Sequence, residues 1–400
     1  MATGSDRILT THVGSLARPE DLRETLNRRH LGQPYNEAIY RQRCREAVEE
    51  IVRNQLAHGI DAVCDGEMSK ISYTTYVKHR LNGISDGADV APGAKPAFAQ
   101  HNFMPPDWQE HPDFREFREK MFGGPSAVKP PVFDGKVSYR DFAPLNEDIA
   151  NLKAAAAKTG ATNLFMNAAS PGVLMVFIPT THYTSEDEYI GDLAEAMRHE
   201  YEAIVNAGIT LQIDAPDIAL ARWLRYTDRS DDEFVRIAER NAEAINHATR
   251  NIPPEKMRLH VCWGNYQGPH SHDFPVARLM GALTKLRPQH ILFEAANPRH
   301  DHEWEDWKAA KLPDDKILVP GLVDSCVTYV EHPRLIAQRL QRYVDIVGRD
   351  RVMAGTDCGF ATWAVVGYQV MPSIVWKKFE ALAEGARMVS DKAWGRASAA

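Results

Sequence analysis

Short apolar runs alternate with longer amphipathic stretches along almost the whole chain. Each apolar run ends in polar or glycine-containing sequence, as the strands of a buried parallel sheet do. Eight such runs are predicted to be strands, at residues 7–15, 61–65, 163–168, 210–214, 257–262, 290–294, 317–324 and 352–357.

Most of the stretches between these runs carry apolar residues at three- and four-residue spacing, which is typical of amphipathic helices. Gly59 and Gly208 follow two of them as stop signals. The clearest helices are predicted at residues 37–58, 185–207, 231–251 and 332–347. This alternation indicates an α/β protein, and eight strands favour a single (β/α)8 barrel over an open sheet.

Residues 83–145 break the alternation. This stretch is rich in Pro, Gly, His and Phe and lies between the second and third predicted strands. It is therefore interpreted as an insertion into a barrel that otherwise takes up residues 1–400. Two roles stay open for the insertion: a lid over the barrel mouth, or a structural flap that completes contacts in a homo-oligomer.

The bulk composition narrows the class of protein. A chain of 400 residues with 44% hydrophobic and 25% charged residues is long enough for one large barrel. A net charge of −7 gives no reason to expect a nucleic-acid partner, and no run of about 18 apolar residues predicts a membrane span. The start of the chain lacks the apolar core of a signal peptide, so a cytoplasmic location is expected. Five widely spaced cysteines suit free thiols better than a disulfide framework.

Four residues at predicted strand ends have the chemistry of metal ligands. They are His260, Cys262, Glu294 and Cys358. Strand ends of a parallel barrel converge on one face, and alternate residues of a strand point the same way, so these side chains can meet. Because two thiolates select zinc over magnesium or calcium, the set predicts a zinc site.

The other strand ends are also polar. Glu67, Asp214 and Asp324 would repel one another in one mouth unless a cation or an amine-bearing ligand lay among them. We expect Glu67 and Asp214 to orient a substrate without holding the metal. His12 lies at the end of the first strand and is a further candidate close to the reaction.

A zinc ion with two thiolates, one imidazole and one carboxylate has a formal charge of about −1. Such a centre is a poor hydrolytic Lewis acid, but it lowers the pKa of a substrate thiol and leaves the sulfur nucleophilic. Glu294, as the weakest ligand, could leave as the thiol binds. The predicted chemistry is attack by sulfur on carbon.

The set His-x-Cys, Glu and Asp-Cys-Gly at successive strand ends resembles the catalytic domain of cobalamin-independent methionine synthase, a zinc-bearing (β/α)8 barrel that methylates homocysteine from a folate donor. The resemblance runs from Thr11-His12-Val13-Gly14-Ser15 to Gly355-Thr356-Asp357-Cys358-Gly359-Phe360. It implies that His260, Cys262, Glu294 and Cys358 bind zinc. It also implies that Ser15, Glu67 and Asp214 hold the amino-acid end of homocysteine.

Three departures from that family make folate use doubtful. Methionine synthases of this kind carry a second, degenerate barrel before the catalytic one, whereas this chain is predicted to form a single barrel. The family motif Asp-Ile-His-Ser reads Asp324-Ser325-Cys326 here, without the histidine thought to handle a proton. Residues 170–177 replace the segment that carries a tryptophan for the pterin ring.

Other stretches resemble a second branch, the epoxyalkane:coenzyme M transferase or 2-hydroxypropyl-coenzyme M lyase, in which a zinc-bound thiolate opens an epoxide. The carrying segments are residues 259–266, 296–300 and 355–360. In this branch Arg299 and His300 would bind a sulfonate or protonate an alkoxide, or they are simply polar residues of a surface loop. Coenzyme M has no amine for Glu67 and Asp214, which argues against it.

The sequence thus predicts a zinc-dependent thiol S-alkyltransferase that binds a small-molecule thiol and a small electrophile or methyl donor. Epoxide opening and methyl transfer remain open, with methionine synthase itself as one alternative. The other alternative is a non-catalytic zinc- or thiol-binding protein. A zinc site closed by Cys and His ligands alone would favour that alternative. The predicted site instead includes Glu294, a ligand that a substrate can displace.

Overall fold

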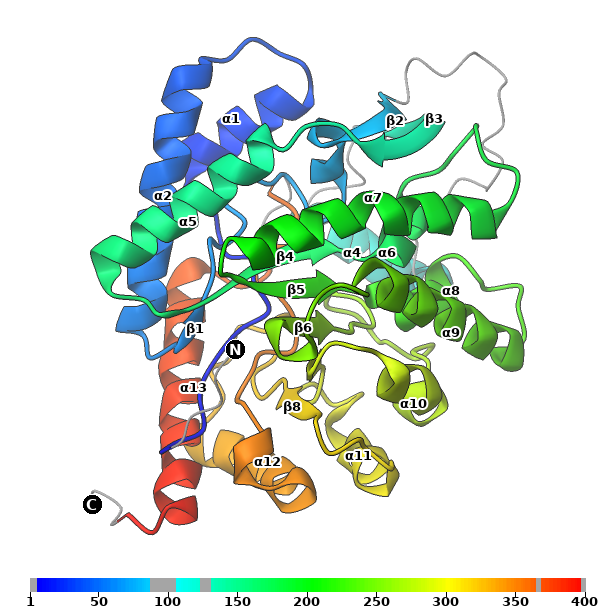
Figure 1. Ribbon diagram of the computed structural model, residues 1–400. Coiled ribbons are helices and arrows are strands. Elements are labelled where there is room, and N and C mark those ends of the chain that lie inside the picture. Colours follow the sequence, from blue (N-terminus) through cyan, green and yellow to red (C-terminus); the bar gives the residue numbers. More distant parts are fainter. Residues whose placement is uncertain (1–5, 87–105, 123–130, 365–367, 397–400) are drawn as a thin grey trace.

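A ring of parallel strands forms the centre of the computed structural model, which describes residues 6–86, 106–122, 131–364 and 368–396. Six strands pair in the order β1-β4-β5-β6-β7-β8, and β2 pairs with β3 in a separate antiparallel sheet (Figure 1). The strands are β1 (Ala62–Val63), β2 (Leu81–Ser85), β3 (Val132–Tyr139), β4 (Asn163–Ala169), β5 (Thr210–Asp214), β6 (Met257–His260), β7 (His290–Phe293) and β8 (Ile317–Pro320).

Two extended segments close the ring between β8 and β1. The Thr11 amide donates to the Ala354 carbonyl at 2.8 Å, and the Ala354 amide donates to the Leu9 carbonyl at 2.9 Å. Parallel bridges join β8 to the segment around residues 352–355, and the Ala62 amide of β1 donates to Thr10. All eight predicted strand positions are therefore confirmed. The first and last form isolated bridges rather than long ladders, partly because the Asp61 carboxylate accepts from the Thr10 amide at 2.9 Å.

Helices surround this ring, and the four predicted helices are confirmed with ends shifted by at most a few residues (Figure 1). At the N-termini of these four helices, backbone amides donate hydrogen bonds to the side chains of Asn36, Ser185, Ser230 and His332. The α-helices are α1 (Glu20–His30), α2 (Glu37–Ala57), α3 (Pro106–Glu110), α4 (Pro112–Phe122), α5 (Ala143–Thr159), α6 (Pro171–Phe177), α7 (Glu186–Asn206), α8 (Ala221–Leu224), α9 (Asp231–Ala248), α10 (Val276–Lys285), α11 (Trp304–Ala309), α12 (Pro333–Val347) and α13 (Pro372–Ala393). Short 3-10 helices occupy Thr75–His79, Pro216–Ile218, Pro254–Lys256, Asp301–Glu303 and Arg349–Arg351.

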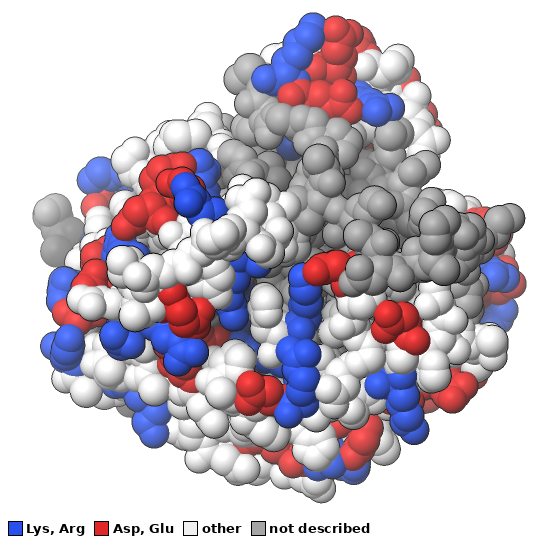
Figure 2. Space-filling view, turned by 90° about the horizontal axis from the view of Figure 1, so that it is seen from above, with Lys and Arg blue, Asp and Glu red and all other residues white. Residues whose placement is uncertain are grey.

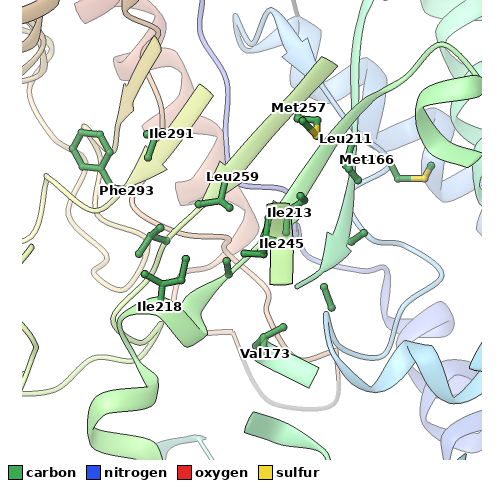
Figure 3. Packing of buried hydrophobic residues seen from close by; sticks show 14 of the residues in the cluster. Met166, Val173, Leu211, Ile213, Ile218, Ile245, Met257, Leu259, Ile291 and Phe293 are labelled. Atoms are coloured by element: carbon green, nitrogen blue, oxygen red, sulfur yellow. The ribbon is translucent and has the colours of Figure 1, made fainter. Parts of the chain in front are cut away.

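The side-chain alternation of the strands separates two apolar layers. Leu211, Ile213 and Leu259 belong to the layer between the ring and the helices (Figure 3). A second cluster, which includes Phe165 and Val319, fills the inside of the ring. Because neighbours on a strand point to opposite faces, Asp214 on β5, next to Ile213, points inward.

The insertion predicted at residues 83–145 includes part of β2, all of α3, α4 and β3, and the start of α5. Residues 87–105 and 123–130 of it lie outside the described residues. Helix α3 rests on the loop that follows β6, where the Trp108 and Tyr266 rings meet edge to face with centroids 5.9 Å apart. The insertion therefore reaches the carboxyl end of the barrel, and its role as a lid remains a prediction.

Charged side chains of both signs are mixed on the face of the molecule that Figure 2 shows. Lys and Arg side chains lie beside Asp and Glu side chains over most of the described face in Figure 2. Within the described segments, no helix is both long and apolar enough to cross a membrane.

Candidate metal centre

Three of the four predicted metal ligands meet at the carboxyl end of the barrel. His260 ends β6, Cys262 lies two residues beyond it, and Cys358 follows the closing segment at residues 352–357. One imidazole nitrogen and the two sulfurs lie within 4.8 Å of one another, and all three residues are buried. The Cys262 and Cys358 sulfurs are 3.7 Å apart. Two sulfurs bound at about 2.3 Å to one tetrahedral zinc ion lie about 3.8 Å apart, so this spacing fits zinc.

The cluster already favours a thiolate. The Cys262 thiol donates to Cys358, which, against the opposing effect of burial, lowers the pKa of Cys358 to about 6 with help from His260. The same hydrogen bond raises the pKa of Cys262. Burial disfavours the imidazolium, but hydrogen bonds to Asp214 and Cys358 outweigh it and raise the pKa of His260 to about 10. A cation bound among these groups would stabilise the negative charge of the thiolate.

Glu294 is beside this group but is not one of the three mutually close ligands in the described part of the chain. It follows β7, and its carboxylate accepts from the Trp263 amide at 2.8 Å and from the Asn297 side chain at 2.7 Å. Both oxygens therefore already accept a hydrogen bond. The role of Glu294 as an exchangeable fourth ligand therefore stays a prediction.

Asp357 is a structural residue of the centre that was not singled out from the sequence. Its buried carboxylate accepts from the amides of Ala295 and Ala296 at 2.9 Å and of Asn297 at 3.0 Å. These bonds tie the loop after β7 to the residue before Cys358. The only hint in the sequence is its place within the Asp-Cys-Gly motif, because the loop amides that it binds leave no side-chain pattern.

Asp214 touches the cluster directly, which the sequence interpretation did not foresee. Its Oδ1 lies 3.5 Å from His260 Nδ1. The side-chain amides of Asn167 and Gln212 donate to its two oxygens at 2.9 and 2.7 Å. The carboxylate is therefore fixed so that it can hold the imidazole, whatever else it binds.

Glu67 and Ser15 lie on the neighbouring part of the mouth. Glu67 is buried, has a left-handed backbone with φ 59°, and its carboxylate is 3.4 Å from the Arg18 guanidinium. Burial raises the pKa of Glu67 to about 7, and the negative charge of Asp214 adds to the effect. A Cβ on Gly359 would stand 2.1 Å from Ser15 Oγ, so Ser15 is packed against the residue that follows Cys358.

The remaining candidates separate into two groups. Asp324 and Arg299 line a cavity of about 130 Å³, together with Glu294, Cys326 and Cys358. His300 lies behind this wall, and its ring nitrogens contact Glu303 at 2.8 Å and Asp273 at 3.1 Å, so neither nitrogen faces a substrate.

His12 belongs to the barrel wall. Its Nε2 lies 2.7 Å from the Gln55 side chain of α2, and its ring packs against Phe165 and Phe379. Burial lowers the pKa of His12 to about 3, so the ring is neutral. These contacts give His12 a packing role.

Comparisons with known proteins agree with this architecture. The family model described as "Cobalamin-independent synthase, Catalytic domain" matches residues 128–370. Methionine synthase of Sulfolobus acidocaldarius is 24% identical over 88% of this chain and 85% of its own length. Methionine synthase of Saccharolobus solfataricus is 22% identical over 96% of this chain and 95% of its own length.

Solved structures show the same fold. A B12-independent methionine synthase from Shewanella sp. W3-18-1, in complex with selenomethionine, is 18% identical and superposes with a TM-score of 0.68 over 96% of this chain and 98% of its own. A putative vitamin-B12 independent methionine synthase from Listeria monocytogenes gives a TM-score of 0.63 at 18% identity, over 96% of this chain and 99% of that one.

These matches correct one step of the sequence interpretation. The single barrel was taken as a departure from methionine synthase, yet the Saccharolobus solfataricus protein is matched over 95% of its own length. A second barrel therefore does not separate this chain from proteins of that name. By the match of its family model across most of the barrel, the chain belongs to the cobalamin-independent methionine synthase family, a family of methyltransferase enzymes.

Proposed function

We propose that this enzyme alkylates a small thiol, with methyl transfer to a homocysteine-like thiol as the first choice, and that the reaction depends on zinc. His260, Cys262 and Cys358 would hold the metal, with Glu294 as the exchangeable fourth ligand. The observation that carries the proposal is the buried cluster of one imidazole and two sulfurs, with 3.7 Å between the sulfurs. When bound there, zinc would lower the pKa of a substrate thiol while keeping its sulfur nucleophilic.

The residues around the cluster have distinct tasks in this proposal. Asp214 holds the imidazole of His260 and, with Glu67, attracts an ammonium group of the substrate. The two carboxylates repel each other, which contributes to the raised pKa of Glu67. An ammonium between them would relieve that repulsion.

In the methyl transfer the substrate thiol loses its proton, its sulfur forms a bond to the methyl carbon, and the bond between that carbon and the donor breaks. The donor leaves with the electron pair of the broken bond and takes up a proton. The cavity lined by Asp324, Cys326 and Cys358 is the place where donor and sulfur would meet. Holding both reactants there supplies proximity and orientation.

Two features of the sequence argue against folate as the methyl donor. Cys326 stands where the family motif has a histidine, and residues 170–177 contain no tryptophan. For these two reasons methyl transfer from a folate polyglutamate should be negligible. Robust turnover of folate polyglutamate with homocysteine would restore methionine synthase as the full description of the activity.

Epoxide opening by a coenzyme-M-like thiol is the second candidate, and Arg299 favours it. The guanidinium of Arg299 lines the same cavity as Cys358 and forms no ion pair among the described residues. It is therefore available for a sulfonate. Because the Arg299 side chain is exposed, an ion pair with a sulfonate there would contribute less to binding than an ammonium held by the two buried carboxylates.

A thermal-shift screen of zinc-loaded protein with homocysteine, coenzyme M and glutathione tests both candidates, because a ligand that binds only the folded state raises Tm. We expect homocysteine to raise Tm in the parent and in Arg299→Gln, but much less in Glu67→Gln. A shift by coenzyme M alone, lost in Arg299→Gln and kept in Glu67→Gln, would favour epoxide opening. If none of the three thiols binds, the proposed function is wrong.

A further inference from the structure

A second group of potential metal ligands lies where the insertion meets the barrel. Asp107 and Glu110 are one turn apart on α3, and His272 lies in the loop that follows β6. One ligand atom from each of these side chains lies within 4.8 Å of the others. The closest pair, His272 Nε2 and Glu110 Oε1, is 2.8 Å apart.

The charge of this group is unbalanced. Two carboxylates face one imidazole, and neither Asp107 nor Glu110 forms an ion pair with Lys or Arg in the described part of the chain. Asp107 is buried, with an exposed fraction of 1%. Its oxygens accept from the Ser271 amide at 3.2 Å and the Tyr266 hydroxyl at 3.4 Å. Each carboxylate oxygen keeps a lone pair for a cation.

The donors select a type of ion. One imidazole nitrogen with two carboxylate oxygens is a set typical of zinc and neighbouring divalent transition metals, whereas calcium and magnesium favour oxygen alone. Two ligands three residues apart on one helix and a third from a separate loop would join the two segments through the ion. The site would therefore act on the position of α3.

The loop that carries His272 begins at the thiolate cluster. The Gly264 amide donates to Cys262 Sγ at 3.2 Å, and residues 264–268 together with His270 line the cavity beside Cys358. Tyr266 connects the two ends, because its ring contacts Trp108 of α3 and stacks on His270 with centroids 4.1 Å apart. Any restraint on His272 and α3 therefore also restrains the wall of the cavity.

We propose that Asp107, Glu110 and His272 bind a divalent transition metal, best zinc, which fastens helix α3 of the insertion to the loop over the barrel mouth. This latch site is separate from the thiolate cluster in its residues and in its donor atoms. It does not depend on the proposed function, because it concerns the attachment of the insertion rather than the chemistry at the sulfurs.

Cobalt titration of metal-free protein, with any affinity tag removed, separates the two sites. Cobalt bound to thiolates gives intense sulfur-to-metal absorption in the near ultraviolet, whereas an oxygen and nitrogen site gives only weak visible bands. We expect the parent to bind two equivalents. Glu110→Gln and His272→Gln should lose the second equivalent and keep the thiolate absorption. His111→Gln, a change at a neighbouring exposed histidine, should retain both.

Hydrogen exchange of the amides of residues 107–111 measures the latch itself, because the His111 amide donates to the Asp107 carbonyl of α3 at 2.9 Å. Adding zinc to protein whose thiolate site is already loaded should slow exchange there in the parent and in His111→Gln, and leave His272→Gln unchanged. A parent that binds one equivalent, or variants that retain the second, would overturn the site. A second equivalent that leaves exchange at α3 unchanged would be an adventitious ion only, and would overturn the latch.

Discussion

At the scale of single residues, hydrogen bonds among the side chains of the candidate metal centre shift their pKa values in opposite directions. The pKa of Cys358 is lowered to about 6 and the pKa of His260 is raised to about 10. At neutral pH the pair therefore already carries opposite charges. The carboxylate of Asp214 holds the other side of the imidazole at 3.5 Å. A thiolate at this position needs no strong base to form.

The purified protein should contain about one zinc per chain in the thiolate cluster, and Cys262→Ser or Cys358→Ser should lose most of it. The reason is that a hard hydroxyl replaces a soft thiolate. Metal analysis after extensive dialysis measures this, with every protein carrying His272→Gln so that the second proposed site does not add zinc to the count. Cys326→Ser is the matched control, because Cys326 lines the adjacent cavity without belonging to the cluster, and it should keep its zinc. Full occupancy in both Cys262→Ser and Cys358→Ser would remove the assignment.

Asp214→Asn should weaken zinc binding by about 10- to 100-fold, the usual effect of losing a carboxylate that orients a metal-binding histidine. Glu67→Gln should leave zinc affinity unchanged, because the Glu67 carboxylate pairs with Arg18 rather than with His260. Competition with a chromogenic chelator measures both variants. The sequence interpretation expected neither carboxylate to affect the metal, so equal affinities in the two variants would show that the 3.5 Å contact has no energetic effect.

At the scale of elements, the turn after β1 places Glu67 in a conformation that L-amino acids rarely adopt. Its φ of 59° follows a φ of 64° at Gly66, so two successive residues are left-handed. Such strain tends to persist where a side chain must be aimed at a site. The turn directs a buried carboxylate into the mouth at the expense of backbone stability.

Glu67→Gly should therefore be more stable than Glu67→Ala by about 1 kcal/mol, although both remove the carboxylate. Glycine adopts the left-handed region without steric conflict, and alanine does not. Chemical denaturation of the two variants under identical zinc loading gives the difference. Equal or reversed stabilities would mean that the turn relaxes to another conformation when Glu67 is replaced.

At the scale of the whole molecule, buried carboxyl groups make the fold sensitive to pH. Burial and the neighbouring Asp214 raise the pKa of Glu67 from 4.5 to about 7. A carboxyl whose pKa is raised on folding contributes stability that is complete below its unfolded pKa and is lost as the pH rises through the folded value. The window for Glu67 therefore runs from about pH 4.5 to pH 7.

Between pH 5 and pH 8 the Tm of the parent should fall more than that of Glu67→Gln. The difference corresponds to at most about 3 kcal/mol, since one pKa unit is worth about 1.4 kcal/mol. Asp217, whose pKa burial raises to about 6, is present in both proteins and cancels in the comparison. Parallel pH profiles for the two proteins would show that Glu67 has an ordinary pKa in the folded state.

The sequence predicted the barrel and most of the centre because strand ends in a parallel barrel converge, whatever the loops do. The apolar runs placed His260, Cys262 and Cys358 at or just beyond strand ends, where the structure brings them together; their role as metal ligands stays a prediction. The orientation of Glu294 depends on the Trp263 amide and on Asn297, and backbone donors leave no pattern in a sequence. His12 was misleading because a polar residue at a strand end can also face a helix, here Gln55 of α2.

The seam that closes the barrel has a consequence for biosynthesis. The Thr11 amide donates to the Ala354 carbonyl, and Cys358 follows this seam directly, so one of the proposed metal ligands is synthesised only after most of the chain has left the ribosome. Contacts that span such a sequence distance form late in folding. A nascent chain therefore lacks a complete thiolate pair until the barrel can close, so zinc binding at the proposed site would come at the end of folding rather than at its beginning.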